Sequence, residues 1–235
     1  MRVGRKAVPM TALVQVDVTV AWKRLEADDL SPTAFVMACV GRTVAAHPEV
    51  HAYRDWRGRL VLHRHVDITV MVEVVTDTGV YPLAHPMQDT DTRSVTDLSD
   101  ELRRIKDTPS RSDSGKMLLR WGNRVANIPG FVPLVYQLAV RSPLVRSWMG
   151  TVTVTSVGMD LGGGGFALGV PSVSSLIVVI GGAAERPWVV DGEIEVRRIL
   201  DLAAHVDHRV VDGAPAARFG AALRTLLENP ERVDW

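Results

Sequence analysis

The sequence contains little cysteine, no net charge and no uninterrupted apolar run long enough for a bilayer. Cys39 is the only cysteine among 235 residues, which excludes an intramolecular disulfide and a thiolate metal cluster. Lys plus Arg and Asp plus Glu each total 27, so no overall field attracts nucleic acid or an anionic membrane surface. The first residues also lack the apolar core of a secretory signal. We therefore expect a cytoplasmic protein that binds neither nucleic acid nor membrane.

The first half of the chain carries the signals of a mixed α and β fold. Alternating apolar and polar residues predict a strand over Ala12–Val20. Ser31 followed by Pro32 predicts a helix that ends before Pro48. Further β-rich runs and one amphipathic helix follow, at 59–63, 66–75 and 94–107, and the helix opens with a capping pattern from Ser94 to Asp97.

The last third returns to strands and ends in a helix. Four β-rich runs cover 150–159, 174–186, 187–199 and 200–208, with a hairpin turn at Asp191-Gly192. The final helix is predicted from about Ala214 to Glu228. The prolines in 107–149 favour two or three short helices there. The order of elements indicates an α+β fold.

One short stretch, "DHRVVDGAPAARF", concentrates the chemistry. His208 and Asp212 lie where a predicted strand meets the last helix. A neutral imidazole at such a junction can act as a general base if one ring nitrogen is fixed by its own carbonyl or a nearby acid. The alternative is that His208 is a capping or core residue and Asp212 the N-cap of the helix. Spacing alone leaves both interpretations open.

Several segments together resemble a known family. "DHRVVDG" resembles the DHRxxDG signature of the acyltransferase component of 2-oxoacid dehydrogenase complexes, whose catalytic domain shares the chloramphenicol acetyltransferase fold. "GTVTVTSVGM" is similar to that family's GTFTISNLG segment, and "ERPWVVDGEIEVRRILDLAAHVDH" follows its last hairpin. "VDVT" and "LSPTAFVMACVGRTVAAHPEV" are similar to its first strand and helix. The resemblance implies a chloramphenicol acetyltransferase-like two-layer sandwich, with helices packed on a mixed sheet.

The resemblance also implies an activity. His208 would be the general base that deprotonates coenzyme A or a dihydrolipoyl thiol, which then attacks an acyl thioester without an acyl-enzyme. Thr155 would donate a hydrogen bond to the oxyanion, with Ser156 as second choice, and Asp212 would hold the loop that orients His208. The family's active sites lie between the subunits of a homotrimer. The implied substrates are an acyl-CoA or an acyl carrier, and the resemblance implies no metal.

Some features depart from the family pattern. We expect residues 1–235 to form a single catalytic-type domain, with no lipoyl or subunit-binding domain and no covalently attached lipoyl group. Residues 107–149 would be a helical insertion, either on the trimer surface or as a wall of the acceptor channel. The family's arginine partner for the motif aspartate is missing, and Arg5 or Lys6 is the substitute. The polar end "ENPERVDW" predicts a free trimer.

Other features are assigned to structure. "GGGG" at 162–165 has no following Lys-Ser/Thr, so a flexible turn is expected and not a phosphate cradle. His63 and His65 share a predicted strand face with Asp67 beyond, but without a further partner exposed histidines are favoured over a metal site. His205 is predicted to be a strand residue and Cys39 a core residue.

Two other functions fit the sequence. The first is a catalytically inactive trimeric scaffold or assembly protein of the same fold, which would not bind coenzyme A. The second is a relative of peptide synthetase condensation domains, whose HHxxxDG motif also ends in Asp-Gly. Those domains need two such halves in one chain, and here Asp207 replaces the first histidine.

Overall fold

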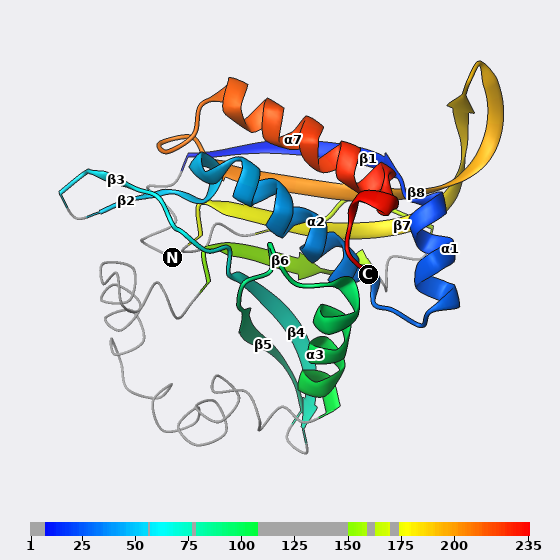
Figure 1. The fold of residues 1–235 in the computed structure, drawn as a ribbon, viewed down its shortest axis with the longest axis horizontal. Coiled ribbons are helices and arrows are strands. Elements are labelled where there is room, and N and C mark those ends of the chain that lie inside the picture. Colours follow the sequence, from blue (N-terminus) through cyan, green and yellow to red (C-terminus); the bar gives the residue numbers. More distant parts are fainter. Residues whose placement is uncertain (1–7, 56, 77–78, 108–149, 159–162, 170–173) are drawn as a thin grey trace.

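A six-stranded mixed sheet organises the molecule, seen in a computed structural model of the chain (Figure 1). The structure describes residues 8–55, 57–76, 79–107, 150–158, 163–169 and 174–235. The strand order is β1-β8-β7-β6-β4-β5. β6 runs parallel to both β4 and β7, and the other pairs are antiparallel. The strands are β1 (Pro9–Asp17), β4 (Ile68–Thr76), β5 (Gly79–Met87), β6 (Val152–Ser156), β7 (Leu176–Val190) and β8 (Glu193–Asp207).

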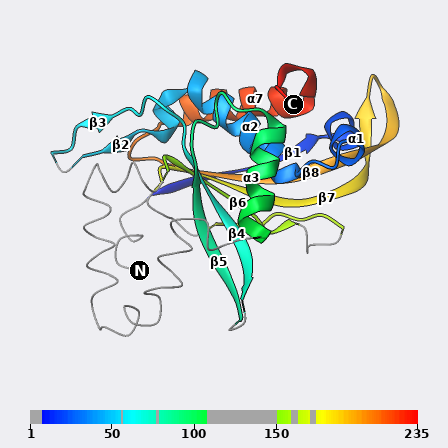
Figure 2. The same cartoon turned by 60° about the horizontal axis from the view of Figure 1, so that its bottom comes forward.

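Helices cover one face of this sheet. Figure 2 shows α2 (Pro32–Ala46) and α7 (Gly213–Glu228) on the same side of the strands. α2 is apolar almost all round and is enclosed by the sheet, α7 and α3 (Val95–Asp107). The main core lies between these layers and includes Phe35, Ile68 and Phe219. This arrangement is the α+β, chloramphenicol acetyltransferase-like sandwich that the sequence predicts.

The opposite face of the sheet, called the open face below, is only partly covered by the residues that the structure describes. A small second cluster forms there around Ile177, Val179 and Ala203, with Ala167 packed against it. Leu13 and Leu168 are exposed apolar residues beside it. The sheet thus has one fully packed face and one face with exposed apolar side chains.

Most of the predicted elements are present, and their bounds correct several expectations. The strand expected over Ala12–Val20 ends at Asp17, and α1 (Thr19–Ala27) begins two residues later. The Asp17 carboxylate accepts hydrogen bonds from the Thr19 amide (2.9 Å) and hydroxyl (2.5 Å), and so favours a helix start over strand continuation. The run at 59–63 is reduced to β3 (Leu60–Val61), which pairs with the unpredicted β2 (Tyr53–Arg54). β5 was also not expected as a strand.

The helix predictions hold well. α2 starts at Pro32 behind Ser31 and ends before Pro48, where the 3-10 helix η2 (Pro48–His51) begins. α7 ends at Glu228, one residue before the 3-10 helix η5 (Pro230–Arg232). The predicted hairpin turn joins β7 to β8, and both Asp191 (φ 50°) and Gly192 (φ 90°) adopt the left-handed conformation that a type I′ turn requires.

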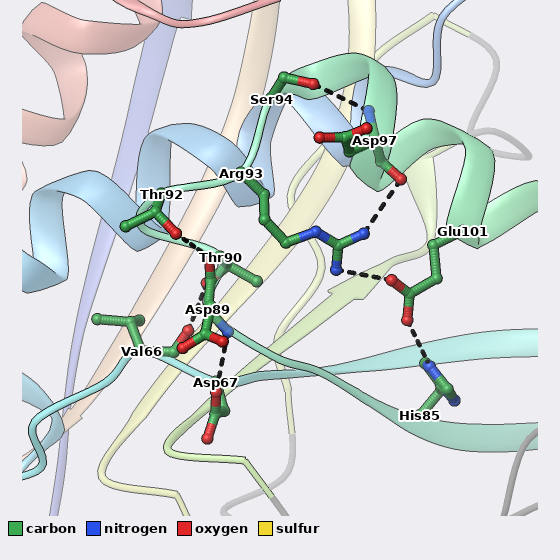
Figure 3. A network of polar contacts seen from close by, with 10 residues as sticks. All are labelled: Val66, Asp67, His85, Asp89, Thr90, Thr92, Arg93, Ser94, Asp97 and Glu101. Carbon is green, nitrogen blue, oxygen red and sulfur yellow. Dashed lines mark hydrogen bonds and ion pairs between the residues drawn. The ribbon is translucent and has the colours of Figure 1, made fainter.

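A polar network attaches α3 to the β4–β5 edge of the sheet (Figure 3). The Ser94 hydroxyl accepts a hydrogen bond from the Asp97 amide (3.0 Å), which confirms the predicted cap. Glu101 binds both His85 on β5 (2.9 Å) and Arg93 (2.6 Å). Burial raises the pKa of Glu101, but these two partners outweigh it and hold the pKa below its usual range. Glu101 is therefore an ionised brace between helix and sheet.

The predicted insertion at 107–149 falls, from residue 108 onward, outside the described residues. Within the described part of the chain, no helix is long and apolar enough to cross a membrane.

Candidate active site

The turn that follows β8 is built around Asp207. Its carboxylate accepts hydrogen bonds from the Arg209 amide (3.1 Å) and from two guanidinium nitrogens of the same residue. Burial raises the pKa of Asp207, but the Arg209 bonds outweigh it and keep the pKa below its usual range. Arg54 on β2 then donates to the Arg209 carbonyl at 3.0 Å. Asp207 and Arg209 therefore fix the turn.

His208 is held by its backbone and by one ring nitrogen. Its amide donates to the carbonyl of Val8 at 2.9 Å, and its Nδ1 lies 3.1 Å from the carbonyl oxygen of Val211. A carbonyl oxygen can only accept, so Nδ1 is protonated, and in the neutral ring Nε2 carries the lone pair. The sequence predicted the partner to be the histidine's own carbonyl or an acid, and the structure replaces both with Val211. The side chain is 47% exposed.

Asp212 occupies the N-cap position of α7, as the capping interpretation predicts, but its side chain makes no capping hydrogen bond. Its carboxylate is 89% exposed and lies 3.9 Å from His208 Nδ1, with no closer ion-pair partner among the residues that the structure describes. The suggested partners, Arg5 and Lys6, lie outside those residues. The role of Asp212 in holding the loop therefore stays a prediction.

Thr155 and Ser156 lie at the end of β6. Val152 and Val154 are fully buried in the main core, so alternation along the strand places Thr153 and Thr155 on the open face. Ser156 has the parity of the core-facing residues. Thr155 pairs with Val179 of the small open-face cluster. Of the two predicted hydroxyl residues, only Thr155 faces the open side of the sheet.

Within one chain, His208 and Thr155 are far apart. Across the sheet, Thr155 on β6 pairs with Val179 on β7, and Val179 pairs with Ala203 on β8. His208 lies five residues further along and two strands away, so strand geometry gives a separation of roughly 20 Å. A base and an oxyanion donor must both lie about 3 Å from one reacting group. The two residues of a single chain cannot serve one substrate.

The open face also carries two buried polar residues of β8, Asp201 and His205. His205 lies within the strand, as predicted. Its Nδ1 lies 2.8 Å from the hydroxyl of Thr11, and its Nε2 accepts a hydrogen bond from the Gly169 amide (3.1 Å). Asp201 was not singled out from the sequence. The available signal was a lone carboxylate inside the apolar run "ILDLAAHV", where an unpaired charge would be costly.

The remaining candidates are structural. His63 and His65 do not lie on a strand, which corrects the sequence interpretation. The ring of His63 lies 5.4 Å from that of His51, and His65 pairs with Asp89 at 3.3 Å. No group of three potential metal ligands occurs within the described ranges. Cys39 is fully buried in the core, and burial raises the pKa of its thiol.

The sequence matches the family model of the 2-oxoacid dehydrogenases acyltransferase (catalytic domain) over residues 3–114 and 148–234. It is 47% identical over 83 residues to the lipoamide acyltransferase component of the branched-chain alpha-keto acid dehydrogenase complex of Pseudomonas putida, a match that covers 34% of this chain and 19% of that protein. The matches to the first curated relatives span 12% to 41% of those relatives' own length.

Solved structures show the same fold. The dihydrolipoamide acetyltransferase of Azotobacter vinelandii superimposes with a TM-score of 0.70 at 20% identity, covering 98% of this chain and 86% of that one. That structure belongs to an investigation of a serine, a histidine and an asparagine in the relative's catalytic mechanism. A chloramphenicol acetyltransferase matches with a TM-score of 0.58 at 17% identity, over 96% of this chain and 92% of its own.

Proposed function

Because the chain belongs to the family of 2-oxoacid dehydrogenase acyltransferase catalytic domains, we propose that it transfers an acyl group between two thiols. The donor is a thioester of coenzyme A or of a lipoyl group, and the acceptor is the other thiol. The observation that carries the proposal is the state of His208. Its Nδ1 donates to the Val211 carbonyl, so in the neutral ring Nε2 is the nitrogen that can accept a proton, and the side chain is half-exposed.

The transfer needs no acyl-enzyme. His208 Nε2 takes the proton of the acceptor thiol, and the thiolate attacks the thioester carbonyl. The carbonyl oxygen becomes an oxyanion in the tetrahedral intermediate, and the Thr155 hydroxyl donates a hydrogen bond to it. Collapse breaks the original carbon–sulfur bond. The departing thiolate then receives the proton from the imidazolium, which restores neutral His208.

The two groups that carry these steps come from different chains. The separation of roughly 20 Å within one chain supports a site that is shared between two copies. Thr155 faces the open side of the sheet, which also carries the exposed Leu13, and such apolar exposure is typical of a surface covered by another protein. We assign this face to contact between copies in a homotrimer, with His208 of one copy facing Thr155 of the next.

The domain assignment is part of the same proposal. The family model matches both sides of residues 115–147 and leaves those residues unmatched, which supports an insertion within one catalytic-type domain. Asp212 is assigned to the loop that carries His208, since its carboxylate lies beside the ring nitrogen that already donates to Val211.

A direct assay tests this function. The purified protein is incubated with a panel of acyl-CoA esters and dihydrolipoamide, and thioester formation is followed by mass. The wild type should transfer at least one acyl group, and His208→Ala should lower kcat by about 10²-fold to 10⁴-fold with the trimer intact. Unchanged turnover in His208→Ala would refute the base. A wild type that neither binds nor turns over any ester would favour an inactive scaffold.

A further inference from the structure

Asp201 has an unusually complete set of partners. Asp201 lies on the open-face side of β8 and is fully buried. One oxygen accepts from Arg186 (3.0 Å) and from the amide of Gln15 (2.9 Å). The other accepts from Arg186 (2.5 Å) and from the backbone N–H of Gly165 (2.7 Å). Four donor atoms from three residues, two of them on Arg186, therefore fill the acceptor positions of one carboxylate.

Three of these donors belong to the sheet, whereas Gly165 belongs to the segment that follows β6. Gly165 also forms a bridge with Gly182, whose N–H donates to its carbonyl at 2.9 Å. Gly182 lies in a bulge of β7, where the pairing with β8 shifts between Ile180 and Ala183. Asp201 thus attaches the glycine segment to a bulge in the middle of the sheet.

The same bulge contacts the end of β6 that carries Thr155 and Ser156. The N–H of Val157 donates to the carbonyl of Ile180 at 3.1 Å. Gly158 approaches Gly181 so closely that an added Cβ would lie 1.5 Å from the Gly181 carbonyl oxygen. Thr155 is two residues before Val157 on this chain. The bulge is therefore packed between the end of β6 on one side and the segment tied to Asp201 on the other.

His205 supplies a second anchor for that segment. It lies four residues after Asp201 and accepts from Gly169, four residues after Gly165. Between the anchors, Ala167 packs on the small cluster of Ile177, Val179 and Ala203. The segment 163–169 therefore runs along β8 beside the row that contains Thr155.

We propose that the Arg186–Asp201 pair is a positioning element for the Thr155 hydroxyl, acting through Gly165 and the β7 bulge. This inference rests on the proposed acyl transfer. The carboxylate is required because an asparagine has one acceptor oxygen and could satisfy at most two of the four donors. The position of an oxyanion donor matters most in the transition state, so its displacement changes kcat more than KM.

The test uses the purified trimer, acetyl-CoA or the best ester of the panel, and dihydrolipoamide. Asp201→Asn and Arg186→Gln should each lower kcat about tenfold or more, with KM changed less than about twofold. Arg186→Lys should restore little of the lost kcat, because an ammonium cannot donate to both oxygens of Asp201 as the guanidinium does. The matched control is Glu185→Gln, which removes the exposed Glu185–Arg198 pair (3.7 Å) of the same hairpin and should keep kcat.

A double-mutant comparison separates positioning from general stability. In a Thr155→Val background, Asp201→Asn should lower kcat by less than about twofold, because the hydroxyl that it positions is gone. An equal loss in both backgrounds, or an unchanged kcat in folded Asp201→Asn and Arg186→Gln trimers, would overturn the inference while the proposed function stands. If Asp201→Asn does not fold, the partly exposed Arg186 variants decide. An inactive wild type overturns the proposed function itself, and the inference with it.

Discussion

Thr155 and Ser156 are adjacent hydroxyl residues that leave β6 on opposite sides of the sheet. The sequence motif could only rank them, because either hydroxyl can donate to an oxyanion. The burial of Val152 and Val154 identifies the core side of β6 and so separates the two. The structure selects Thr155 because it shows which side of β6 faces the core, and the local sequence does not show this.

Substitution of the two hydroxyls should therefore give unequal results. Thr155→Val should lower kcat about 10²-fold, because the donor to the developing oxyanion is lost while the shape is kept. Ser156→Ala should change kcat less than about twofold, and it serves as the matched control. Steady-state acyl transfer measures both. A larger loss in Ser156→Ala than in Thr155→Val would contradict the assignment.

His51 is a buried histidine remote from the proposed chemistry. It is 2% exposed, and its Nδ1 lies 3.0 Å from the hydroxyl of Thr151. Burial first, and the nearby His63 second, lower the pKa of His51 to about 4. In the unfolded chain the imidazole titrates near its ordinary value of about 6.5. The folded protein therefore holds His51 neutral where the unfolded chain would protonate it.

This difference predicts a loss of stability in acid. Neutral His51 contributes about 3 kcal/mol to the free energy of unfolding. This contribution is fully present above about pH 6.5 and is lost as the pH falls toward 4. Urea denaturation between pH 7.5 and pH 4.5 should show a shallower acid loss in His51→Gln than in wild type. His65→Gln, at an exposed imidazole, should retain the wild-type loss. Equal slopes in His51→Gln and wild type would disprove the linkage.

At the level of elements, the glycine that follows β6 is required by the close approach of its backbone to the β7 bulge. Gly158→Ala would place a Cβ 1.5 Å from the Gly181 carbonyl oxygen, and backbone cannot move aside cheaply. We expect destabilisation of about 3 kcal/mol or more, from strain and displacement of the bulge.

Gly220 in α7 is the matched control. An added Cβ there meets nothing within 4 Å, so Gly220→Ala should stabilise the protein by about 0.5–1 kcal/mol through helix propensity. Thermal or urea unfolding compares both variants with wild type. A Gly158→Ala protein as stable as Gly220→Ala would show that the close approach is not maintained.

The sequence predicts elements well where local signals and tertiary structure agree. Ser94, Pro32 and Asp191-Gly192 mark helix starts and a turn whose geometry is local, and each is confirmed. The strand prediction fails at Val18–Val20, because β-branched residues favour a strand whereas the Asp17 side chain and burial of Ala21 favour α1. The anchoring by Asp201 could not be predicted, because its partners are up to 186 residues away in the chain.

For the whole molecule, the proposed site is a property of the assembly. His208 and its turn stand in one short motif, and the His208–Val211 and Asp207–Arg209 contacts are local, whereas Val8 and Arg54 bind this turn from distant parts of the chain. The partner hydroxyl was implied only by family resemblance, and the register of β6, β7 and β8 places it far from His208 of the same chain. The hairpin arm that projects beyond α1 in Figure 1 carries exposed apolar side chains of its own, at Val189, Ile194 and Val196.

Subunit mixing tests the shared site most directly. His208→Ala and Thr155→Val proteins, each nearly inactive, are refolded together with distinct mass tags so that mixed trimers form. In a head-to-tail ring, about a quarter of random interfaces then combine an intact His208 with an intact Thr155. The mixture should regain activity toward about a quarter of the wild-type value. Mixed trimers that are seen by native mass spectrometry but are no more active than the separate variants would contradict the shared site.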